Sequence, residues 1–220
     1  MARRVLSFPK LTVSPSAGRT LTRVDASDTS QFVGGRWAGW QREFDVAGGT
    51  SPPGYEIMSR ERVDGAVLER TFTTPDERST SIVDLGQLVT SDEICVFDDD
   101  DRASKNEWHL RTTFKSAEGR VRVTLRTTSD GLAVSPRKPR VRIAVESCSD
   151  CAGPAPCWAT DSFVASEDGD SVCWFPGDVE LRFDGGVVRI AYRSMAVERR
   201  FDANSRDLLD LRFAGEYFFN

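Results

Sequence analysis

Apolar and polar residues alternate along most of the chain after residue 30, and this alternation constrains the fold more than any other feature of the sequence. In residues 120–126, for example, Val121, Val123 and Leu125 fall on one face and arginines on the other. A period of two residues is that of a β-strand with one buried face. The same pattern predicts strands over residues 36–44, 55–63, 67–73, 93–97, 108–114, 120–126, 140–145, 179–183, 187–192, 197–201 and 208–213.

Turn-forming residues separate these segments. Pairs such as Asp64-Gly65, Glu118-Gly119 and Asp130-Gly131 recur roughly every 10 to 12 residues. Such spacing is typical of an antiparallel meander, so we expect one all-β domain. The one expected helix is short and spans residues 26–33. The sequence has no Gly-rich nucleotide-binding loop, which disfavours nucleotide-binding α/β folds.

The charge balance and the histidine content narrow the function classes. The net charge of −5 gives no overall field that attracts a polyanion, so we expect no nucleic-acid partner. No run of about 18 apolar residues occurs, so we expect no membrane span. His109 is the only histidine, which excludes sites that need two or more imidazoles. This scarcity of acid–base groups favours a protein that holds a ligand over an enzyme.

The first 25 residues differ from the rest of the chain. They are rich in Ser, Thr and Pro, and their basic residues all precede the first acid, Asp25; these are Arg3, Arg4, Lys10, Arg19 and Arg23. This composition is typical of an organelle transit peptide, and the alternative is a basic arm packed along the domain. We expect an intracellular protein, in a plastid or otherwise in the cytoplasm. We therefore divide the chain into residues 1–25 and one barrel domain, residues 26–220.

Lysine occurs only at positions 10, 105, 115 and 138, so nearly all of the 29 basic residues are arginines. Guanidinium groups bind carboxylates through two parallel hydrogen bonds, which favours a surface or pocket for carboxylates. A GC-rich coding sequence also raises the arginine content without any chemical role. Both explanations stay open at the level of the sequence.

A Gly-x-Trp sequence, Gly35 to Trp37, opens the first predicted strand after a short polar stretch. It resembles the opening of the calycin, or lipocalin-like, barrels, in which a tryptophan on the first strand plugs the closed end. The chain is most similar to the uncharacterised lipocalin-like family of plants, algae and cyanobacteria and to the phycobiliprotein chromophore lyases. The resemblance rests on Trp37, Gly39, Arg42, Phe44, Asp45 and Gly48-Gly49, and on residues 174–183, 197–202 and 208–216.

The resemblance implies an antiparallel meander closed into a lipocalin-like barrel. Such a barrel encloses a cavity for one small ligand, and inward-facing arginines would bind its acidic groups. We therefore expect a hydrophobic, anionic ligand, either a tetrapyrrole (a bilin or a chlorophyll-type pigment) or a lipid. The residues expected to bind it are Arg42, Trp40, His109 and Arg200. Trp37 is expected to stack against an arginine of the last strands, with Arg199, Arg200 and Arg212 as candidates.

Four cysteines follow one another late in the chain. Cys148 and Cys151 form a Cys-x-x-Cys, and Cys157 and Cys173 come after it. Four thiolates can bind zinc, but the second half of the set lacks this spacing, so we assign no metal and keep the four only as an alternative. A redox pair or disulfide, and a loop without thiol chemistry, are the other interpretations.

Three function classes follow. The first is a protein that binds or carries the anionic ligand in a barrel cavity. The second is an interaction or assembly subunit of a larger complex, a photosynthetic one by the resemblance, whose barrel is filled with side chains. The third is an enzyme on the same barrel, a chromophore lyase or isomerase, in which Arg42 or His109 would take part. No catalytic residue is assigned, and the partner is a small hydrophobic ligand or another protein.

Overall fold

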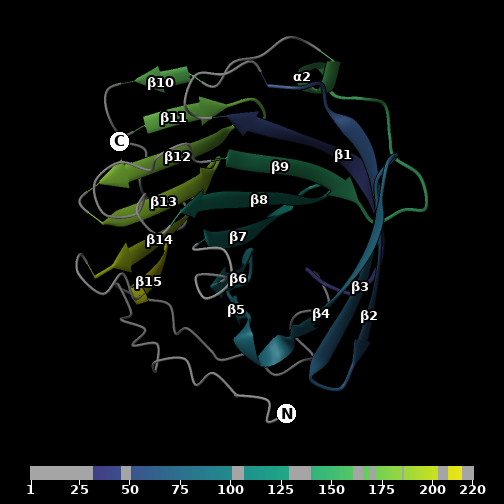
Figure 1. Cartoon of the computed structure of the whole chain (residues 1–220), viewed down its shortest axis with the longest axis horizontal. Coiled ribbons are helices and arrows are strands. Elements are labelled where there is room, and N and C mark those ends of the chain that lie inside the picture. The colour runs from purple at the N-terminus through teal and green to yellow at the C-terminus, as the bar shows by residue number, and fades with distance from the viewer. Residues whose placement is uncertain are drawn as a thin grey trace.

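The structure is a computed structural model that describes residues 32–45, 51–100, 107–128, 140–160, 166–168, 172–184, 186–202 and 208–214. These residues form two antiparallel β-sheets with little helix (Figure 1). The expected all-β, antiparallel class is confirmed. The segment 1–25 and the expected helix over residues 26–33 lie outside the described residues, except for Phe32 and Val33, which form part of a turn.

The large sheet has nine strands in the order β4-β3-β2-β1-β9-β8-β7-β6-β5. Strand β1 lies at an inner position because it pairs with both β2 and β9. The 3-10 helix η2 (Leu85–Gln87) lies between β4 and β5. The strands are β1 (Gly35–Asp45), β2 (Tyr55–Asp64), β3 (Val67–Thr73), β4 (Arg78–Asp84), β5 (Val89–Thr90), β6 (Ile94–Asp100), β7 (Glu107–Ser116), β8 (Gly119–Thr128) and β9 (Arg140–Ser147).

The small sheet has six strands that follow one another in chain order. A short helix, α2 (Cys157–Thr160), lies between it and the large sheet in the sequence. Neither helix of the described residues has the length and apolar character that a membrane crossing requires. The strands are β10 (Ser166–Asp168), β11 (Val172–Phe175), β12 (Val179–Asp184), β13 (Val187–Tyr192), β14 (Met195–Phe201) and β15 (Leu208–Ala214).

The large sheet is strongly curled. The guanidinium carbon of Arg122 on β8 lies 5.6 Å from the ring centre of Phe72 on β3, although three strands separate β8 from β3 in the sheet. Neighbouring strands lie about 4.8 Å apart, so a flat sheet would hold these side chains much farther from each other. The face that carries Arg122 and Phe72 is therefore the concave face of a half-barrel (Figure 1).

The convex face of the large sheet packs on the small sheet. Val123 of β8 and Ile143 of β9 form one core with Leu181 of β12 and Ile190 of β13. Trp158 of α2 joins the same core. The alternation found in the sequence therefore places apolar side chains between the sheets and polar side chains inside the half-barrel.

The described strands do not form the single closed barrel that we expected. After β9 the chain leaves the large sheet, and the remaining strands pair only with one another. The edges of the large sheet, β4 and β5, approach each other through side chains instead of strand pairing. There Leu68, Val83, Leu88 and Cys95 pack in a second, smaller core.

Candidate functional site

Five charged side chains fill one end of the half-barrel. This inner cluster consists of Glu61 (β2), Arg70 (β3), Arg120 and Arg122 (β8) and Glu146 (β9). Arg120 has no exposed surface, and its Nη2 donates to Glu61 Oε1 at 2.8 Å while its Nε donates to Glu146 Oε2 at 2.9 Å. Arg70 Nε donates to Glu61 Oε1 at 2.7 Å. Arg122 binds both oxygens of Glu146 through Nε and Nη2.

Trp37 is buried against the inner cluster, at the end of the half-barrel that we call the closed end because the side chains of Arg120, Glu61 and Glu146 have no exposed surface there. Its ring centre lies 4.0 Å from the guanidinium carbon of Arg120, and its Nε1 donates to the carbonyl oxygen of Gly34 at 2.8 Å. Arg120 also donates to the carbonyl oxygen of Phe32. The expected arginine on Trp37 is present, but it comes from β8, because β14 and β15, which carry Arg199, Arg200 and Arg212, belong to the other sheet.

The charges of the inner cluster stabilise each other. Burial by itself raises the pKa of Glu146, but Arg122 and Arg120 outweigh it and lower this pKa to about 2. Burial likewise opposes, without cancelling, the lowering of the Glu61 pKa by Arg70 and Arg120. The nearby Arg70 and Arg120 lower the pKa of the Cys95 thiol on β6, but burial outweighs them and raises this pKa to about 12. Both carboxylates are therefore ionised at neutral pH and the thiol is not.

The other end of the half-barrel is more open. At the end of β1, Glu43 accepts from Arg142 Nη2 at 2.9 Å and from Arg140 Nη1 at 3.2 Å. The side chains of these two arginines are 45% and 58% exposed. His109 and the exposed Arg126 lie opposite each other on the same face, in β7 and β8. We call this region the open end.

Basic residues outnumber acids on the whole concave face, as far as its side chains are described. This is the opposite of the chain as a whole, which has a net charge of −5. Strand register and side-chain contacts place the following residues on this face: the bases are Arg70, Arg111, Lys115, Arg120, Arg122, Arg126, Arg140 and Arg142, and the acids are Glu43, Asp45, Glu61 and Glu146.

Arg42 and Trp40, two of the expected ligand-binding residues, lie on the opposite face of β1. Arg42 is only 1% exposed and donates to the carbonyl oxygens of Pro52 at 2.8 Å, Ser51 at 3.2 Å and Trp158. Trp40 Nε1 donates to the carbonyl oxygen of Gly153 at 3.0 Å. Both side chains therefore hold neighbouring loops on the large sheet, and of the four expected residues only His109 lies on the concave face.

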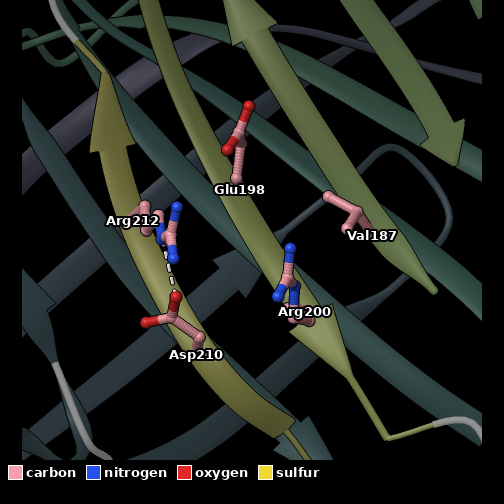
Figure 2. A pocket seen from close by; sticks show the side chains of 5 residues that line it. All are labelled: Val187, Glu198, Arg200, Asp210 and Arg212. Carbon is pink, nitrogen blue, oxygen red and sulfur yellow. Dashed lines mark hydrogen bonds and ion pairs between the residues drawn. The ribbon is translucent and has the colours of Figure 1, made fainter. Parts of the chain in front are cut away.

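Arg200 lines a small cavity on the outer face of the small sheet. Figure 2 shows its side chain beside Val187 and Asp210, with Glu198 and Arg212 nearby. The cavity holds about 30 Å³, enough for a few water molecules, whereas pockets for small organic ligands hold several hundred. Asp210 Oδ1 is buried there and accepts no hydrogen bond from the described residues. The cavity is therefore suited to water, and Arg200 is not brought together with the other expected residues.

The structure does not bring the four late cysteines together in one cluster. Cys148, Cys151 and Cys157 are exposed, while Cys173 is buried in the core between the sheets. No group of three or more metal-ligating side chains occurs among the described residues. None of the five cysteines, all of which lie among the described residues, forms a disulfide.

Sequence reasoning missed the inner cluster. The alternation placed Arg120 and Arg122 on one face of a strand, but no local signal pairs them with Glu61, which lies 59 residues from Arg120. The one sign in the sequence was Glu61, a charged residue on the same strand face as Tyr55, Ile57 and Val63. Glu146 gave no such sign, because it follows the arginine face of its strand, yet both carboxylates are as buried as the apolar core.

No protein-family model matches this chain, and no curated protein matches it in sequence. Among solved structures, it is similar to the crystal structure of a protein of unknown function from Nostoc punctiforme, a member of the DUF3598 family. The TM-score is 0.50 and the sequence identity 10%, over 84% of this chain and 96% of that chain. At this identity the similarity shows the fold alone, which is a curled antiparallel half-barrel shared with a cyanobacterial protein.

Proposed function

We propose that this chain binds a small anionic ligand with an apolar part, a tetrapyrrole or a lipid, on the concave face of the half-barrel. The observation that carries the proposal is the excess of arginine on this face. Arg140 and Arg142, both half-exposed, share the single carboxylate of Glu43 at the open end. Guanidinium groups with unused donors are suited to carboxylate recognition.

The closed end supports the same proposal. Trp37 and Arg120 are buried there, so a ligand would enter from the open end and meet the charged side chains of the inner cluster. A lipocalin-like arrangement of this kind, with one plugged end and one open end, is what the resemblance implies. The ligand's acidic group is then held by the arginines, and its apolar part lies along the half-barrel.

The test is a titration of the full chain with biliverdin and with decanoate, followed by absorbance and calorimetry. We expect one molecule bound per chain, and binding weakened by salt. The double variant Arg140→Ala/Arg142→Ala should bind biliverdin, which carries two carboxylates, about tenfold more weakly. Arg182→Ala/Arg193→Ala is the matched control, because those arginines are similarly exposed and paired with single acids on the small sheet. Absence of binding to the wild type, or equal affinity in both double variants, contradicts the proposal.

A second candidate is an assembly subunit with a filled half-barrel. The inner cluster favours it, since Arg120, Glu61 and Glu146 occupy the closed end without exposed surface. The same titration separates the two candidates, because a filled half-barrel binds neither probe. A chromophore lyase or isomerase activity rests on the resemblance alone.

A further inference from the structure

The two carboxylates of the inner cluster are saturated with donors. Glu61 accepts from Arg70, from Arg120 and from the backbone nitrogen of Gly34, at both of its oxygens. Glu146 accepts from Arg120 and Arg122, also at both oxygens. Within the described residues, three guanidinium groups therefore share two carboxylates. One positive charge is in excess.

The unused donors belong to Arg70 and Arg122. Among the described residues, Arg70 donates only through Nε, and Arg122 only through Nε and Nη2. Their side chains are 18% and 15% exposed, whereas that of Arg120 has no exposed surface. The excess charge is therefore on the accessible side of the inner cluster, inside the half-barrel.

Apolar surface lies next to these donors. The Phe72 ring packs against the guanidinium of Arg122 at 5.6 Å, and the small residue Ala144 pairs with Arg122 across β8 and β9. Three largely buried guanidinium groups that share only two carboxylates leave one positive charge uncompensated among the described residues, which is costly. The arrangement therefore suits a group that carries two acceptor oxygens on an apolar stem.

We propose that Arg70 and Arg122 bind one oxyanion, a carboxylate or a phosphate, on the accessible side of the inner cluster. Each guanidinium has donors left for one oxygen or more, and bidentate contacts to such planar or tetrahedral anions are the strong ones. The proposal deepens the proposed function when the oxyanion is the head group of the bound ligand. A free inorganic anion is the other source of the same chemistry.

Calorimetry on the full chain distinguishes the two sources. The probes are decanoate, the uncharged decanol of equal chain length, and inorganic phosphate. Arg70→Met is the test variant: Glu61 keeps Arg120 and Gly34 as partners, and two guanidinium groups then face two carboxylates, so the fold is retained. Arg36→Met is the matched control. Arg36 also forms a 2.7 Å ion pair, with Asp150, but it lies in β1 on the convex face of the large sheet, away from the inner cluster. Arg70→Lys keeps the charge and should restore part of the binding.

If the head group of the ligand occupies the site, the wild type and Arg36→Met prefer decanoate over decanol by about tenfold, and Arg70→Met loses this preference. If a free anion occupies it, phosphate binds to the wild type and to Arg36→Met but not to Arg70→Met, while decanoate does not bind. If Arg70→Met binds decanoate as well as the wild type does, and phosphate as well as the wild type does, the oxyanion site is overturned and the proposed function stands. Failure of every probe to bind the wild type overturns both.

Discussion

The guanidinium of Arg120 stacks on the ring of Trp37 with 4.0 Å between the guanidinium carbon and the ring centre, and both side chains are buried. Arg120 holds Glu61 on β2 and Glu146 on β9 at the same time. One side chain thus joins the first strands of the large sheet to its middle strands, so the closed end depends on it.

The shape of the Arg120 guanidinium should matter as much as its charge. Arg120→Lys keeps the charge but cannot donate to two carboxylates and cover Trp37 together, so we expect the free energy of unfolding to fall by about 2 kcal/mol or more. Arg193→Lys is the control, because Arg193 lies 5.1 Å from the Tyr192 ring centre but is exposed. Urea denaturation measures the free energy of unfolding of the two variants. Similar small decreases in both would contradict a central role for Arg120.

Removal of the negative charge of Glu146 should destabilise the protein strongly. Glu146→Gln leaves Arg120 and Arg122 buried with only Glu61 as counter-charge, and the expected loss is about 3 kcal/mol or more. Glu180→Gln removes a more exposed carboxylate that pairs with Arg189 at 2.8 Å, and should cost about 1 kcal/mol or less. Equal unfolding midpoints for the two variants would show that the inner cluster adds no stability.

Acid should weaken the fold in a defined window. The pKa of Glu146 falls from 4.5 to about 2 on folding, so its contribution is fully present above pH 4.5 and is lost as the pH falls towards about 2. The full effect is on the order of 3 kcal/mol. Unfolding free energies measured between these pH values should decline steeply in the wild type and less steeply in Glu146→Gln. Parallel declines in the two proteins would refute this assignment.

Gly39 should not tolerate a side chain. A Cβ there would lie 1.9 Å from the carbonyl oxygen of Val145 on β9, a contact that only a backbone shift relieves. We expect Gly39→Ala to lower the free energy of unfolding by about 2 kcal/mol or more. Gly153→Ala is the control, because a Cβ at Gly153 meets no atom within 4 Å. Comparable thermal midpoints of the two variants would contradict the close β1–β9 approach.

The cysteines should divide into two reactivity classes. Cys148, Cys151 and Cys157 are exposed, whereas Cys95 and Cys173 are buried. The Cys95 pKa of about 12 also leaves almost no thiolate at neutral pH. Iodoacetamide labelling of the native protein, mapped by mass spectrometry, should modify the three exposed cysteines and spare the other two until urea is added. Labelling of Cys95 at the rate of Cys151 would show that the closed end opens in solution.

Strand positions were largely predictable because a half-buried strand repeats every two residues, and every segment with that alternation is a strand in the structure. Strand β4 was not predicted, because it lacks this alternation. Of its seven residues, only Val83 is buried, so Arg78–Asp84 carries no apolar alternation. The stacking of an arginine on Trp37 was expected from the resemblance, although the arginine, Arg120, was not among the candidates.

The sequence by itself determined the strands, the antiparallel class and the separation of arginines from apolar residues on β8 and β9. Only the tertiary structure decided that the arginine face is the inside of a half-barrel, and that Arg42 and Trp40 hold loops on the other side. The physical reason is that alternation assigns residues to two faces without saying which one curls inward. Strand order and curvature, set by contacts between residues as distant as Glu61 and Arg120, make that choice.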